Sequence, residues 1–116
     1  MLKISRLAVL VFFLAIATVA YAHPPTDIAI TFDPSSKVLK AVITHPVSNV
    51  GNHFIAKVDV GLNGKEVIEH KISRQDNNST QTVSYLLPDV KPGDTVSVEA
   101  YCSISGKLVK EIKIIE

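Results

Sequence analysis

The sequence predicts an all-β protein, an immunoglobulin-like antiparallel β-sandwich of about seven strands. Through most of the chain, apolar and polar residues alternate with a period of two, which is the pattern of strands that bury one face. Short turn sequences rich in Gly, Pro, Asn, Asp and Ser separate these stretches, at the spacing typical of a sandwich. Beyond residues 1–22, no segment has a helical apolar stripe. A partly closed Greek-key barrel is the competing all-β architecture.

Four strands are expected in the first half of the chain, each because alternate positions are apolar and a turn sequence follows. Asp33-Pro34-Ser35-Ser36 is typical of a turn after the first strand. Asn63-Gly64 is the strongest hairpin signal, since both residues accept the positive φ angles of a type I′ turn. The expected strands are 27–32, 38–45, 54–62 and 65–72. The side chains expected to share a face in the first three are Ile28, Ile30 and Phe32, then Leu39, Ala41, Ile43 and His45, then Phe54, Ala56, Val58, Val60 and Leu62.

Three further strands are expected after a polar loop at 73–79. The first of them is 82–87. Pro92-Gly93-Asp94 then forms a turn into a strand at 95–102, and residues 103–106 form a turn into a last strand at 107–115. The strand at 95–102 alternates most regularly, and the residues that share its apolar face are Val96, Val98, Ala100 and Cys102.

Residues 1–22 have the layout of a secretory signal peptide. Lys3 and Arg6 precede the apolar run 7–19, and Ala20-Tyr21-Ala22 matches a cleavage site. An uncleaved anchor is the alternative, although the apolar run is short for a membrane span of roughly 20 residues. Cleavage leaves one domain, residues 23–116, of 116 − 22 = 94 residues. The expected location is periplasmic or secreted, with no stable membrane anchor after cleavage.

The net charge argues against nucleic-acid binding, and the single cysteine excludes an internal disulfide. Removing Lys3 and Arg6 changes the balance to 10 basic and 11 acidic residues, a formal charge of 10 − 11 = −1. Without a basic stripe, nucleic acid is not an expected partner. Cys102 is the single cysteine, so it cannot form an internal disulfide. In an exported protein this thiol is explained as a metal ligand, an intermolecular bridge or a buried structural residue.

Strand direction brings four metal-type ligands to one end of such a sandwich. His23 precedes the first strand, His45 ends the second, His53 precedes the third and Cys102 ends the sixth. The loops after the second and sixth strands lie at the same end of an immunoglobulin-like fold. Neutral imidazole and thiolate suit zinc, copper and iron rather than calcium or magnesium. The sequence therefore predicts a metal site formed by these four residues.

Each of these residues also has a structural interpretation. Cys102 aligns with core positions and so fits a buried thiol. His45 and His53 fit loop-capping and rim positions, and His23 fits a frayed terminus. The fourth histidine, His70, lies between Glu69 and Lys71 and is expected to be a solvated strand residue outside the site.

Two segments resemble a known family. They are Thr44-His45-Pro46-Val47 with His53-Phe54-Ile55, and Val98-Glu99-Ala100-Tyr101-Cys102-Ser103-Ile104-Ser105-Gly106. Together with Asn63-Gly64-Lys65 they look like the iron domain of superoxide reductases and desulfoferrodoxins, over 23–112. The resemblance implies an immunoglobulin-like fold and a non-haem iron with four histidines in a plane and an axial cysteine. By the same resemblance, His23, His45 and His53 are histidine ligands and Cys102 is the axial thiolate.

The chain departs from that family at three places. Ser105 stands where the family has its last histidine ligand, Tyr21 and Ala22 replace a Glu-Lys pair, and the loop between His45 and His53 is two residues longer. The ligand set is therefore three histidines and one cysteine. Water, Ser105 or the free amine of His23 are candidates for the remaining position. With one histidine fewer, zinc or copper are alternatives to iron.

The resemblance implies an exported non-haem iron protein that reduces superoxide to peroxide with electrons from a donor protein. Whether the activity is retained is left open by Ser105. A second interpretation is a metal-free carrier, because the His-Pro segment and Asn63-Gly64-Lys65 also resemble the immunoglobulin-like carrier subunit of thiosulfate-oxidising systems. Cys102 belongs to the reductase pattern rather than to that carrier. A third is a generic exported adhesion or chaperone-like sandwich.

Overall fold

The computed structural model describes residues 23–115. The predicted signal peptide, residues 1–22, therefore lies outside the described residues. Over 23–115 the chain contains seven strands and no helix. Accordingly, this part of the chain offers no helix with the length and apolar character needed to cross a membrane.

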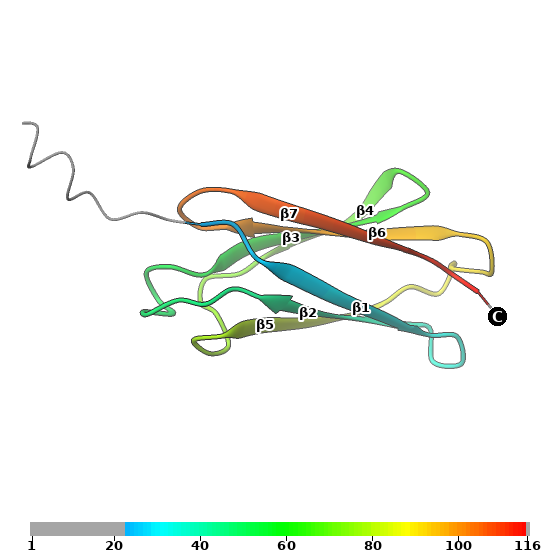
Figure 1. Cartoon of the computed structure of the whole chain (residues 1–116). Helices are drawn as coiled ribbons and strands as arrows, with labels where there is room; N and C mark the ends of the chain where they lie inside the picture. Colours follow the sequence, from blue (N-terminus) through cyan, green and yellow to red (C-terminus); the bar gives the residue numbers. More distant parts are fainter. Residues whose placement is uncertain (1–22, 116) are drawn as a thin grey trace, which may run out of the picture.

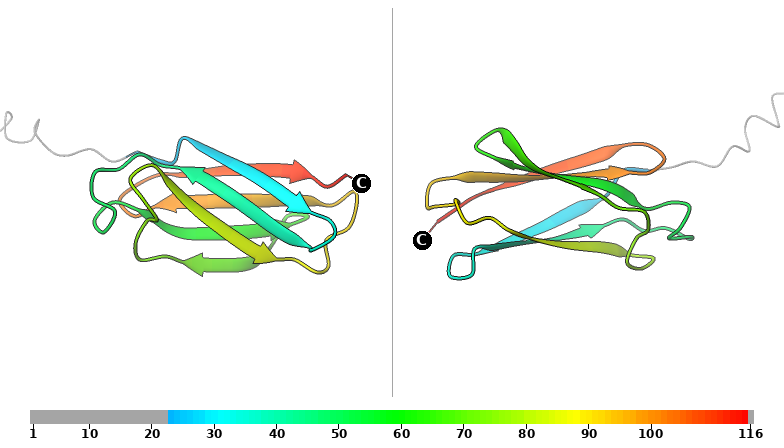
Figure 2. Two further views of the ribbon diagram at one scale, coloured as in Figure 1. Left: turned by 90° about the horizontal axis from the view of Figure 1, so that it is seen from below. Right: turned by 180° about the vertical axis from the view of Figure 1, so that it is seen from behind.

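Two antiparallel sheets pack face to face, which confirms the predicted β-sandwich (Figures 1 and 2). The smaller sheet has the order β1-β2-β5 and the larger the order β4-β3-β6-β7. The tight turn at Asn63-Gly64, with φ angles of 52° and 84°, forces β4 to pair with β3 in the larger sheet. The strands are β1 (Asp27–Asp33), β2 (Val38–Thr44), β3 (Ile55–Leu62), β4 (Lys65–Lys71), β5 (Thr80–Leu86), β6 (Thr95–Cys102) and β7 (Lys107–Lys113).

The core lies between the inner faces of the two sheets. Alternate residues of β2 and β6 supply its centre, as the period-two pattern predicts. The apolar residues with no exposed surface are Leu39, Ala41, Ile43, Ile55, Val58, Val60, Val96, Val98 and Ala100. The observed strand ends differ from the expected ones by at most two residues, the largest difference being the start of β5 at Thr80 and the end of β7 at Lys113.

At the start of β3, the predicted orientation of the side chains is wrong. The alternation predicts that Phe54 and Ala56 face the core, whereas Ile55 is fully buried and both of its neighbours are only partly buried. The reason is a β-bulge: Ile55 lies opposite Cys102 and Lys57 lies opposite Tyr101, which leaves Ala56 as an extra residue. A bulge shifts the alternation by one position, so the faces change just after His53.

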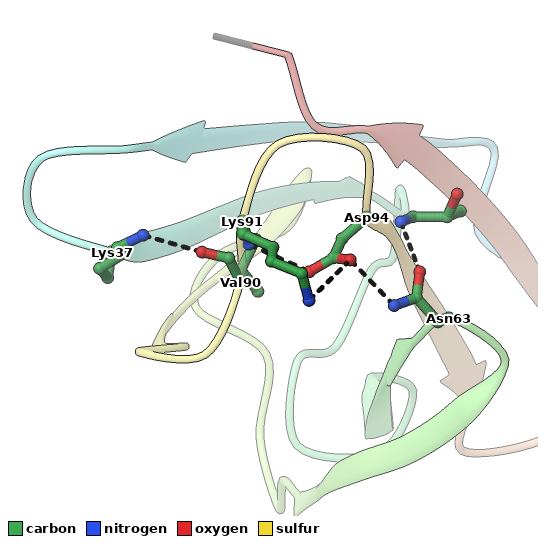
Figure 3. A network of polar contacts seen from close by, with 6 residues as sticks. Lys37, Asn63, Val90, Lys91 and Asp94 are labelled. Carbon is green, nitrogen blue, oxygen red and sulfur yellow. Dashed lines mark hydrogen bonds and ion pairs between the residues drawn. The ribbon is translucent and has the colours of Figure 1, made fainter.

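A polar network joins the β3–β4 turn to the loop before β6 (Figure 3). The side-chain amide of Asn63 donates to Asp94 Oδ1 at 3.0 Å, and its oxygen accepts the Thr95 N–H at 2.9 Å. The Lys91 N–H donates to Asp94 Oδ2 at 3.0 Å. The bonds that Asn63 and Lys91 donate lower the pKa of Asp94 below its ordinary value of 3.8, and the Asn63 donor is the largest cause.

This shift predicts a specific acid sensitivity. A carboxyl group whose pKa is lowered by folding stabilises the protein above its unfolded-state value, here near 3.8, and that stability is lost as the pH falls through the lower folded value. We expect the urea midpoint of wild-type protein to fall more between pH 5 and pH 2.5 than that of Asp94→Asn. Asn63→Gly keeps the positive φ but removes the donor, so its loss should be intermediate. An equal loss in all three proteins would show that Asp94 does not contribute.

Candidate metal centre

Three histidines from separate segments meet at one end of the sandwich. His23 precedes β1, His45 follows β2 and His53 lies two residues before β3. One ring nitrogen from each lies within 4.8 Å of the others, and the ring centroids are 4.8 Å, 5.1 Å and 4.8 Å apart. The segments that carry them lie at the end of Figure 1 where the β2–β3 and β6–β7 loops gather. The convergence of the histidines expected from strand direction is confirmed.

His45 is held where β2 leaves its sheet. Its main-chain N–H donates to the Ser79 carbonyl at 2.9 Å, which continues the strand pairing of Thr44 with Thr80. Its side chain therefore points inward like those of Ala41 and Ile43, and it has no exposed surface. A fully buried imidazole requires hydrogen-bonding partners.

Gln75 supplies one of these partners. Its side chain, only 1% exposed, places Oε1 2.9 Å from Nδ1 of His45. Sequence reasoning missed Gln75, because it lies within the polar run 73–79 and nothing in the sequence distinguishes it from its neighbours.

His23 contacts the β2–β3 loop, and the residue after it contacts the β6–β7 turn. Its Nε2 lies 2.8 Å from the Pro46 carbonyl oxygen, and its own carbonyl oxygen lies 3.1 Å from Nε2 of His45. The following residue, Pro24, contacts Gly106 so closely that a Cβ at Gly106 would lie 2.9 Å from the Cβ of Pro24. The missing side chain of Gly106 thus leaves room for the segment that carries His23.

His53 presents the least satisfied nitrogen of the group. Its main-chain N–H donates to the Asn49 carbonyl at 2.9 Å. Its ring atom Nε2, however, is buried and has no hydrogen-bond partner among the described residues. Burial, followed by the charges that His45 and His23 carry when protonated, lowers the pKa of His53 below its ordinary value of 6.5. The neutral imidazole that results is the form that ligates metals.

Cys102 lies at the same end but outside the set of atoms that share the 4.8 Å limit. It ends β6 opposite Ile55, is buried, and shares the inward face of Val98 and Ala100 as predicted. The Ile104 N–H points at its sulfur with an N–S distance of 3.4 Å. The structure therefore brings three of the four predicted ligands together, and ligation by Cys102 stays a prediction.

Two other residues weighed from the sequence lie away from the three rings. Ser105, which replaces a histidine of the family pattern, is exposed in the β6–β7 turn. His70 is exposed on β4, and its Nδ1 lies 2.7 Å from the Tyr85 hydroxyl. Neither belongs to the histidine group.

The arrangement fits a metal ion. Three imidazoles are a known ligand set for zinc sites with an open position, and the same donors suit copper and iron. Nε2 of His53 is buried and has no partner in the part of the chain that the structure describes, and it is the kind of atom that an ion would satisfy. His23, His45 and His53 thus form a group that could hold a metal ion, and these donors alone do not select one metal.

A scan against protein-family models and a search of curated proteins found no match to this chain.

Proposed function

We propose that this protein is an exported non-haem iron protein that reduces superoxide to peroxide at the centre formed by His23, His45 and His53. The observation that carries the proposal is the convergence of three imidazoles, one before β1 and two at the ends of the β2–β3 loop. One of their nitrogens, Nε2 of His53, is buried and has no hydrogen-bond partner within residues 23–115. Burying Nε2 of His53 with no hydrogen-bond partner among the described residues is unfavourable, and a bound cation offsets that cost. The choice of iron and of superoxide rests on the resemblance to superoxide reductases.

Bound ferrous iron would supply one electron to superoxide, which with two protons gives hydrogen peroxide, and a donor protein would restore the ferrous state. The three imidazoles bind as neutral groups, so a ferrous centre with one thiolate ligand would keep a net positive charge. Such a positive site attracts the superoxide anion. In this proposal Cys102 supplies a thiolate ligand, which would increase electron density at the centre.

Iron uptake by histidine variants tests the proposal. We expect the protein to bind one equivalent of ferrous iron under anaerobic conditions. His53→Ala should weaken binding by more than the 10–100-fold typical of losing an outer-shell partner. His70→Ala is the matched control, because this exposed histidine lies on β4 outside the group, and it should bind like wild type.

The amount of peroxide formed per superoxide consumed tests the proposed reaction. Reduction yields one peroxide per superoxide consumed, at the expense of an added electron donor, whereas dismutation yields one peroxide per two. We expect the first ratio for the iron-loaded protein and no such reaction for His53→Ala. No iron uptake by wild type would contradict the proposal and favour the metal-free carrier, and uptake of zinc or copper in preference to iron would reassign the metal.

A further inference from the structure

We infer that Gln75 is a positioning residue of the metal centre, which fixes His45 in the tautomer whose Nε2 lone pair is available to an ion. This inference rests on the proposed metal-binding function and extends it to a residue outside the ligand set.

The orientation of the Gln75 amide is determined by main-chain groups. Its Nε2 lies 2.8 Å from the His45 carbonyl oxygen and 2.9 Å from the Asn77 carbonyl oxygen, and both of these can only accept. Its Oε1 lies 3.2 Å from the Ile55 N–H, which can only donate. Rotating the amide by 180° would break all three bonds, so the oxygen must face the ring of His45.

The orientation of this amide favours one position for the hydrogen of His45. Two acceptors compete for the ring hydrogen of neutral His45, because Oε1 of Gln75 lies 2.9 Å from Nδ1 and the His23 carbonyl oxygen lies 3.1 Å from Nε2. The shorter contact is made by an oxygen that the other bonds of Gln75 hold in place, and it therefore favours the hydrogen on Nδ1. A neutral imidazole then has its lone pair on Nε2. That atom faces the His23 carbonyl oxygen at 3.1 Å, an acceptor that cannot donate to it. A cation is the kind of partner that this nitrogen lacks, and an N–H held by an outer group is the usual arrangement of a ligating histidine.

Gln75 also connects the two loops around the site. Its main-chain N–H donates to the Val50 carbonyl at 3.1 Å. Its side-chain oxygen accepts the N–H of Ile55, two residues after His53. One buried residue thus sets the ring of His45 and braces the main chain on both sides of His53. An apolar substitute would lose the acceptor and leave three main-chain groups without a partner.

Two variants and a matched control separate positioning from general stability. Gln75→Met is similar in length and removes every polar contact. Gln75→Glu keeps an acceptor for Nδ1 but loses the N–H groups that bond the His45 and Asn77 carbonyls, so it tests the acceptor separately from these two bonds. Gln81→Met is the control, since Gln81 is 5% exposed and its amide bonds Asp76 and Thr82 rather than the histidines.

The first measurement is long-range ¹⁵N–¹H NMR of the histidine rings in the metal-free protein above neutral pH. We expect wild type, Gln75→Glu and Gln81→Met to have His45 protonated at Nδ1, and Gln75→Met to lose this preference. The second is ferrous iron titration, in which Gln75→Met should bind about 10–100-fold more weakly, and Gln81→Met should bind like wild type. Gln75→Glu should stay closer to wild type than to Gln75→Met.

Two results would overturn the inference: His45 protonated at Nε2 in wild type, or equal iron affinity in Gln75→Met and Gln81→Met. Failure of the proposed function is distinguishable, because wild type would then take up no iron, and the role of Gln75 at a metal centre would fall with it. If wild type binds iron and Gln75→Met binds it equally well, only the inference fails.

Discussion

Gly106→Ala is expected to weaken metal binding strongly while leaving the sandwich folded. Gly106 has a φ of 88° in the β6–β7 turn, and an added Cβ would lie 2.9 Å from the Cβ and 3.1 Å from the N of Pro24. Because Pro24 is rigid, the segment must move away from the turn. His23 precedes Pro24 and would move with it. We expect iron affinity to fall by at least about tenfold, since one ligand is displaced.

A control variant measures the effect of the backbone strain that Gly106→Ala introduces. Gly93 has a φ of 94° and no atom within 4 Å of an added Cβ, so Gly93→Ala has the strain without the collision. That strain costs about 1–2 kcal/mol, and the collision at Gly106 adds about 1–3 kcal/mol. Urea unfolding and iron titration of both variants give the comparison. Equal iron affinity in the two would mean that the β6–β7 turn does not position His23.

The fold could be predicted from local sequence because most strands obey a strict alternation and end at strong turn signals. The start of β3 is the exception. The bulge at Ala56 follows from how β3 pairs with β6, and pairing between distant strands leaves no mark on the local pattern. Ile55, expected to face outward, is consequently buried between the sheets.

In the candidate site, too, some residues could be predicted from the sequence and others could not. His23, His45 and His53 could be brought together on strand direction alone, because the end at which a strand starts or stops follows from its place in the chain. Gln75 could not, since a polar residue in a polar loop becomes distinctive only when the loop folds over His45. The role of Gly106 was equally hidden, because it depends on the contact with Pro24.

Cys102→Ser is expected to abolish the visible sulfur-to-iron charge-transfer absorption of the oxidised iron-loaded protein. A serine hydroxyl stays protonated near neutral pH and is a poor replacement for a thiolate ligand. Iron affinity should also fall by at least about tenfold. The substitution changes one buried atom, so the sandwich should persist with a loss of about 1–3 kcal/mol for burying the more polar hydroxyl.

Ala100→Ser is the matched control that separates ligation from burial. Ala100 lies two residues earlier on the same inward face of β6 and has no exposed surface, so it receives the same hydroxyl in the same layer. If Cys102 is a ligand, only Cys102→Ser loses the absorption and the affinity, although both variants lose stability. If Cys102 is a core thiol, the two variants will differ from wild type in stability alone. The centre would then depend on its three histidines, and that ligand set is closer to an open zinc site than to a thiolate-bound iron.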